Sequence, residues 1–136
     1  MKEIFVDTSA LLPILNQDDQ DYETSLRIWL RLAEEHAQLV TSNYVLVETL
    51  ALIQNRLGMT AVQDFVERFQ PLLQVIWIDD ALHEAALLLF LTANQRRLSL
   101  VDCASFAICR QRQIEQVFAF DQHFVEHGFT CLQRPV

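Results

Sequence analysis

The stretch EIFVD, residues 3–7, decides the fold of this chain, because an apolar run ends in an aspartate and a helical pattern follows at once. Short apolar runs of this kind predict a strand that is buried on both faces. The next eight residues, TSALLPIL, predict a helix, and Pro13 is tolerated near its first turns. We therefore expect a buried strand that leads directly into a helix.

The same order of strand and helix repeats along the chain. Further strands are expected at residues 38–42, 73–78, 116–120 and 129–133, the last of them short, with helical patterns between them. This alternation predicts a parallel sheet covered by helices on both faces. We expect an α/β fold of three α/β/α layers, with a short sheet of four to five strands in a single domain over residues 1–136. Ligands bind at the carboxyl ends of the strands in such folds.

Composition and charge exclude several function classes. The 136 residues are 51% hydrophobic, which is enough to bury a core, and the net charge of -8 argues against a broad basic face for nucleic acid. Lys2 is the only lysine, so a receiver domain or a haloacid-dehalogenase-like phosphatase would lack its site lysine. Two glycines are too few for a phosphate-binding loop or a dinucleotide fingerprint.

The start of the chain does not resemble a signal peptide. The longest apolar run, ALLLFL, is far shorter than the ~20 residues of a membrane span. We therefore expect a cytoplasmic protein without a membrane partner.

Cysteine and histidine predict neither a disulfide scaffold nor a zinc site. Cys103, Cys109 and Cys131 have no paired spacing, so reduced and partly buried thiols are expected. His123 and His127 are four residues apart and can share a helix face for zinc. No third soft ligand is nearby in the sequence, and we expect both to be surface histidines.

Four acidic residues stand where the carboxyl edge of the sheet is predicted. Asp7 and Asp121 each end a predicted strand, after apolar or aromatic residues. Asp102 opens a predicted helix, and Glu48 lies about one and a half turns into another, so both are near the same edge. Like charges this close raise one another's pKa and persist if a cation neutralises them. Oxygen ligands alone suit Mg²⁺ or Mn²⁺.

Each acid also has a simpler interpretation, and these alternatives remain open at the level of sequence. Asp7 can cap the helix that follows it, and Ser99 with Asp102 fits a capping box. Asp121 can start a turn, and Glu48 can belong to a solvated helix face. The four simpler interpretations would be separate coincidences, which favours a shared site.

The segments that carry the acids resemble the motifs of a known family. They are FVDTSALL with Asp7, YVLVETLALI with Glu48, LSLVDCASFAIC with Asp102 and VFAFDQHF with Asp121. In this order, and from end to end, the sequence resembles the PIN domain family and in particular the bacterial VapC-like ribonuclease toxins. The first and third segments are fairly specific, and the segment of Glu48 is looser.

This resemblance implies the chemistry of the site. The expected metal-binding and catalytic residues are Asp7, Glu48, Asp102 and Asp121. Asp7 and Asp102 match the surest ligands of a Mg²⁺ or Mn²⁺ ion, and the other two complete the site directly or through water. The hydroxyl of Thr8 or Ser9 is expected to help at the site, toward the substrate. The implied reaction is metal-dependent hydrolysis of RNA phosphodiester bonds.

The resemblance also implies partners. Arg96 and Arg97 precede the helix of Asp102 and are expected either to meet substrate phosphates or to be solvated at a helix end. The implied partners are an RNA substrate, a small antitoxin that covers the site, and a second copy of the chain in a homodimer. The alternative is a catalytically silent PIN-like module that docks a partner peptide or RNA. Its candidate surface, unless these residues are ordinary core, lies on the first helices at Leu11, Leu12, Leu26 and Trp29.

Overall fold

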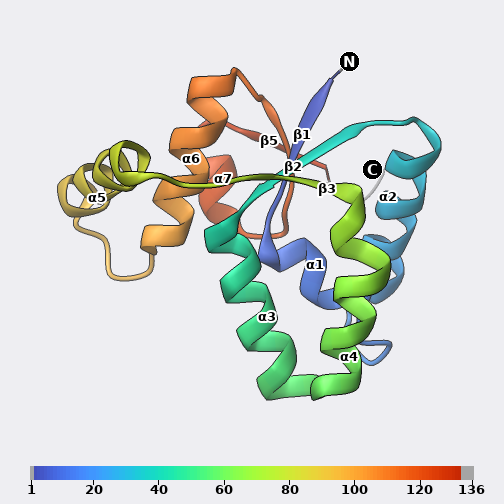
Figure 1. Ribbon diagram of the computed structural model, residues 1–136. Helices are drawn as coiled ribbons and strands as arrows, with labels where there is room; N and C mark the ends of the chain where they lie inside the picture. Colours follow the sequence, from blue (N-terminus) through green and yellow to red (C-terminus); the bar gives the residue numbers. More distant parts are fainter. Residues whose placement is uncertain (1, 133–136) are drawn as a thin grey trace.

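The computed structural model describes residues 2–132, and within that range it contains a five-stranded parallel sheet (Figure 1). The strands are β1 (Glu3–Val6), β2 (Gln38–Ser42), β3 (Leu73–Ile76), β4 (Gln116–Phe118) and β5 (Thr130–Cys131). They lie in the order β3-β2-β1-β4-β5, and every neighbouring pair is parallel. The predicted fold class and the number of strands are confirmed.

Helices cover both faces of this sheet. They are α1 (Thr8–Ile14), α2 (Tyr22–Glu34), α3 (Asn43–Leu57), α4 (Met59–Asp64), α5 (Asp80–Ala93), α6 (Leu100–Arg112) and α7 (Gln122–Glu126), with a π-helical turn at Phe65–Phe69 and a 3-10 turn at Gln70–Leu72. Figure 1 shows α6 and α7 on one side of the strands and α1, α2 and α4 on the other. The three predicted layers are therefore present, and α5 lies beyond α6, away from the sheet.

The first helices belong to the core. Leu11 and Trp29 are only 1% and 4% exposed. Leu12 and Leu26 are partly buried against the same core, which includes Phe5 of the central strand. Buried side chains of this size contribute to folding through the apolar area they remove from water. The structure thus supports ordinary core packing for these residues, and they do not form a free docking face.

Three strands end earlier than the sequence predicts, and after two of them a side chain accepts the backbone hydrogen bond that a strand partner would accept. The backbone N–H of Ile78 donates to Asn43 Oδ1 at 2.8 Å instead of continuing β3. The N–H of Phe120 donates to Ser9 Oγ at 2.9 Å, which ends the pairing of β4. The predicted last strand is reduced to β5, and Gln133 lies outside the described residues.

The three cysteines are free thiols, as expected. Cys103 and Cys109 are fully buried, and Cys131 is partly buried. Burial raises the pKa of each thiol, to about 12 for Cys109, so all three are neutral.

Along residues 2–132, no helix combines the length and the apolar character needed to cross a membrane. The assignment of residues 1–136 to a single domain stays a prediction.

Candidate functional site

Three aspartates lie at helix N-termini on the carboxyl edge of the sheet. Asp7 follows β1 and caps α1, Asp121 follows the β4 segment and caps α7, and Asp102 lies in the first turn of α6. The N–H of Asp7 donates to Phe118 O at 3.0 Å, so the end of β1 is fixed beside the end of β4. Helix N-termini favour negative charge, which helps to keep carboxylates at this edge. The structure thus brings these three aspartates to the edge where the sequence predicts them, and their role as metal ligands stays a prediction.

Asp102 is both a cap residue and a member of the cluster. Its N–H donates to Ser99 Oγ at 3.0 Å, and its Oδ2 accepts from the Ser99 N–H at 3.1 Å, which completes a capping box. Asp102 is 8% exposed, and burial raises the pKa of its carboxyl group, as does repulsion from Asp121. The Ser99 hydrogen bonds and nearby His123 oppose this increase. The cap therefore orients a carboxylate that is costly to ionise without a cation.

Asp7 is held by the residue two positions further on. Its Oδ2 accepts from Ser9 N at 3.1 Å and from Ser9 Oγ at 2.7 Å. The same Ser9 hydroxyl accepts from Phe120 N, so it joins the start of α1 to the segment after β4. Asp7 is 4% exposed, and burial raises the pKa of its carboxyl group to about 7, although the Ser9 hydrogen bonds lower it. Repulsion from Asp102 and Glu48 adds to the increase.

Glu48 is partly buried on α3 rather than fully solvated. Burial raises the pKa of its carboxyl group, and repulsion from Asp102 and Asp121 raises it further, whereas a hydrogen bond with Thr8 lowers it. The Thr8 hydroxyl also lies 2.9 Å from the Thr49 hydroxyl, so it fixes α1 against α3. Glu48 is therefore not a freely solvated position, since it is partly buried and interacts electrostatically with all three aspartates.

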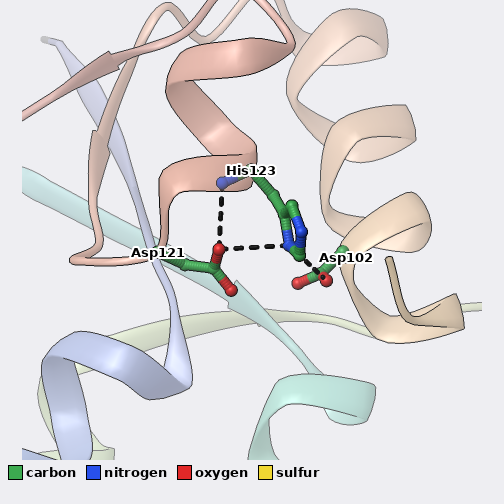
Figure 2. Close-up of side chains that lie close together, drawn as sticks. All are labelled: Asp102, Asp121 and His123. Atoms are coloured by element: carbon green, nitrogen blue, oxygen red, sulfur yellow. Dashed lines mark hydrogen bonds and ion pairs between the residues drawn. The ribbon is translucent and has the colours of Figure 1, made fainter. Parts of the chain in front are cut away.

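His123 is the residue that sequence reasoning missed. Figure 2 shows its ring between two carboxylates, with Nδ1 at 3.1 Å from Asp121 Oδ1 and 3.3 Å from Asp102 Oδ2. Its side chain is 20% exposed, so the expectation of a surface histidine is wrong here. The usable signal is its position in the first turn of a helix that starts directly after a strand-terminal acid. His127 instead stacks on Phe106, with ring centroids 4.4 Å apart.

The two predicted arginines lie outside this cluster. Arg96 and Arg97 are exposed in the connection between α5 and α6, and they form no ion pair with any described residue. Throughout residues 2–132, the four acids form no ion pair with lysine or arginine. Among the described residues, the negative charge at the edge therefore has no lysine or arginine to balance it, and His123 is the one basic side chain beside it.

These donors fit a divalent cation. One donor atom from each of Asp102, Asp121 and His123 lies within 4.8 Å of the others, and Asp7 and Glu48 lie outside this group of three. His123 Nδ1 is buried and has no hydrogen-bond partner. A cation between the three side chains would satisfy that nitrogen and offset the repulsion among the carboxylates. Oxygen-rich sites with an imidazole accept Mg²⁺, Mn²⁺ or related ions.

Fold and site together define a class of protein. The family model of the PIN domain matches residues 4–129, so the chain belongs to the PIN domain family. The resemblance seen in the sequence is thereby confirmed.

Within that family, the chain is similar to VapC proteins. It is 35% identical over 128 residues to the 23S rRNA-specific endonuclease VapC20 of Mycobacterium tuberculosis, covering 93% of this chain and 95% of that protein. The crystal structure of VapC20, described as a sarcin-ricin loop cleaving toxin, superposes with a TM-score of 0.86 at 32% identity and covers 96% and 99% of the two chains.

More distant structures share the fold. FitAcB from Neisseria gonorrhoeae matches with a TM-score of 0.67 at 16% identity, covering 94% of this chain and 95% of that one. DNA-bound VapBC from Salmonella typhimurium matches with a TM-score of 0.70 at 16% identity, covering 96% and 97%.

Proposed function

We propose that the protein is a metal-dependent endoribonuclease and the toxin of a toxin–antitoxin pair. The observation that carries the proposal is the set of four carboxylates, Asp7, Glu48, Asp102 and Asp121, at one sheet edge where no lysine or arginine of the described residues pairs with them. Similarity to an endonuclease that acts on 23S rRNA supports RNA as the substrate. A silent binding module is disfavoured, because uncompensated acids destabilise a fold that has no use for a cation.

We assign a separate role to each residue of the site. Asp7 and Asp102, which match the surest ligands of the family, would hold a Mg²⁺ or Mn²⁺ ion together with Asp121, and Glu48 would complete the site directly or through water. When bound, the ion supplies a Lewis acid that makes water more acidic and offsets charge on phosphate oxygens. The Ser9 hydroxyl already bonds to Asp7 and to the Phe120 N–H, so we assign it the positioning of that carboxylate rather than direct contact with substrate.

The surroundings of the site fit an RNA substrate. Thr8 would position Glu48 through the contact between α1 and α3. Arg96 and Arg97 are exposed in the segment just before the Ser99 cap, where they can meet phosphates that flank the cleaved bond. Because the net charge is -8, we expect the bound cation to supply much of the attraction for RNA. A ribosomal RNA substrate would place the activity in the cytoplasm.

The proposed protein partners are a small antitoxin and a second copy of the chain. Large apolar side chains remain exposed on and before α5, with Trp77 at 73%, Leu88 at 68% and Leu91 at 64% exposure. Exposed apolar patches of this kind mark protein interaction sites. We assign this surface, rather than the first helices, to protein contacts.

The test is cleavage of RNA by purified protein with Mg²⁺ or Mn²⁺, with and without a chelator. Intact ribosomes and an isolated sarcin-ricin loop hairpin serve as substrates. We expect wild type to cleave only with metal and Asp102→Asn to be inactive. Asp79→Asn is the matched control, because Asp79 also caps a helix, accepting from Leu82 N at 3.0 Å, but lies outside the cluster. Equal cleavage by wild type and Asp102→Asn would overturn the proposal.

A further inference from the structure

The feature that the four-acid site does not explain is the ring of His123. Its Nδ1 atom is shielded from solvent and has no hydrogen-bond partner, although two carboxylate oxygens lie beside it (Figure 2). Leaving a buried polar atom unpaired costs about 1–3 kcal/mol, so such atoms call for an explanation.

A direct hydrogen bond does not provide that explanation. The oxygens of Asp121 and Asp102 are 3.1 Å and 3.3 Å from Nδ1, close enough for hydrogen bonds, yet neither contact has the required direction. When the ring is neutral and Nδ1 carries the lone pair, the two carboxylates repel that nitrogen. The arrangement becomes favourable when a cation lies between the three donors.

The distances match the edges of a coordination shell. In an octahedral site with metal–ligand bonds of about 2.1 Å, neighbouring ligand atoms lie about 3.0 Å apart. The two contacts of Nδ1, at 3.3 Å and 3.1 Å, are near this value. The backbone favours the same placement, because the His123 N–H donates to Asp121 Oδ1 at 2.9 Å and fixes the two residues together.

We propose that His123 donates Nδ1 to the metal site and thereby makes the site prefer Mn²⁺ over Mg²⁺. This inference rests on the proposed function, since it assigns a further ligand to the same site. Imidazole is a good ligand for first-row transition metals, whereas Mg²⁺ prefers oxygen ligands and water. A shell of carboxylates and water alone would discriminate less between the two ions.

The test measures metal binding directly and does not depend on cleavage. Mn²⁺ is titrated into metal-free wild type, His123→Asn, His127→Asn and Asp102→Asn, and free Mn²⁺ is followed by electron paramagnetic resonance. Mg²⁺ affinity is measured by competition. We expect His123→Asn to lose about tenfold or more in Mn²⁺ affinity and much less in Mg²⁺ affinity. His127→Asn is the matched control, because this histidine lies at the other end of α7, and it should bind as wild type does.

A spectroscopic readout identifies the ligand itself. Electron spin echo modulation of bound Mn²⁺ should show coordinated histidine nitrogen in wild type and not in His123→Asn. Isotopic labelling of histidine nitrogen should change the wild-type signal, which tests the inference even if the variant does not fold. Absence of nitrogen modulation in wild type, with binding abolished by Asp102→Asn, would overturn the histidine ligand and leave the acidic site standing. Equal Mn²⁺ binding by wild type and Asp102→Asn would overturn the site as a whole.

Discussion

The two ends of strand β1 carry acids in opposite electrostatic settings. At the amino end, Glu3 pairs with Arg112, whose Nε donates to Glu3 Oε1 at 3.2 Å while Nη2 bonds to the other oxygen. At the carboxyl end, Asp7 has no basic partner among the described residues, and burial raises its pKa, with a further increase from repulsion by Asp102. One edge of the sheet neutralises its charge internally, and the other leaves charge for a ligand.

Helix α6 repeats this contrast. Asp102 lies in its first turn and Arg112 in its last turn, which is where the helix dipole favours an acid and a base respectively. Strand β1 and helix α6 therefore build two different arrangements. At one edge they form the Glu3–Arg112 ion pair, which we call the closed end, and at the other they contribute Asp7 and Asp102 to the acidic cluster, which we call the open end. This difference indicates that the lack of an arginine or lysine partner at the carboxyl edge is a property of the site and not of a chain that is short of arginine.

The largest expected effect comes from the open end. Asp7→Asn and Asp102→Asn should each reduce RNA cleavage by about a hundredfold or more, which is roughly 3 kcal/mol of transition-state stabilisation. If both residues act through one metal site, the double variant should be no worse than either single variant. The measurement is the single-turnover rate of RNA cleavage at saturating Mg²⁺ for wild type, the two single variants and the double variant.

Multiplicative losses in that double variant would show that the two carboxylates act independently. The shared site would then be wrong, even if each single variant were inactive.

The second effect is on stability and concerns pH. Asp7 titrates near its ordinary pKa of 3.8 in the unfolded chain and at about 7 in the folded, metal-free protein. Between these values the folded state binds more protons than the unfolded state, so the free energy of unfolding falls as pH rises. The full shift corresponds to at most about 4 kcal/mol. Denaturant melts in chelator from about pH 4 to pH 7 measure this decrease.

Asp7→Asn should flatten the same pH dependence, because the amide oxygen can still cap α1 through Ser9 N and carries no charge. Saturating Mn²⁺ should restore wild-type stability at neutral pH by binding the folded state. A wild-type protein whose metal-free stability rises from about pH 4 to pH 7 as much as that of Asp7→Asn would contradict this account.

Much of the fold and of the acidic cluster could be predicted because it depends on local patterns. Apolar runs that end in Asp7 and before Asp121, with a helix directly after each, predict the alternation of strands and helices along the chain and the edge to which the acids belong. The Ser99 and Asp102 spacing gave the capping box. Asp102 can belong to the capping box and to the acidic cluster at once. One of its carboxylate oxygens accepts the Ser99 hydrogen bond, and the carboxylate still faces the neighbouring acids.

The rest depends on contacts between residues that are far apart in the sequence. Ser9 bonds to Phe120 across 111 positions and ends β4 early, which no local pattern indicates. The sequence predicts a surface position for His123, because no third soft ligand lies near it and His127 along the chain, whereas its contact with Asp102 depends on how α7 packs beside α6. The sequence does not show what the apolar residues of α1 and α2 pack against, whereas in the structure they belong to the same core as the sheet.

The third effect tests how the open end is held in place. Ser9→Ala removes a hydrogen bond from Asp7 and leaves the Phe120 N–H without its acceptor. We expect a loss of about 1–2 kcal/mol in unfolding free energy and about tenfold in cleavage. Because the Ser9 bonds lower the Asp7 pKa, the pH profile of cleavage should shift to higher pH. Ser9→Thr keeps the hydroxyl and should recover most of the activity. If Ser9→Ala loses stability but its pH profile of cleavage does not shift, Ser9 has a purely structural role.

The smallest effect belongs to the closed end. The side chains of Glu3 and Arg112 are 21% and 32% exposed, so their ion pair is partly screened by solvent. Glu3→Gln should cost about 0.5–1 kcal/mol of unfolding free energy, and a double-mutant cycle with Arg112→Gln isolates the pair. Neither variant should alter Mn²⁺ affinity or cleavage, because the neutral pair lies at the opposite edge of the sheet from the acids. A change in metal affinity in Glu3→Gln would mean that β1 or α6 couples the two edges, and the independence of the closed and open ends would then be wrong.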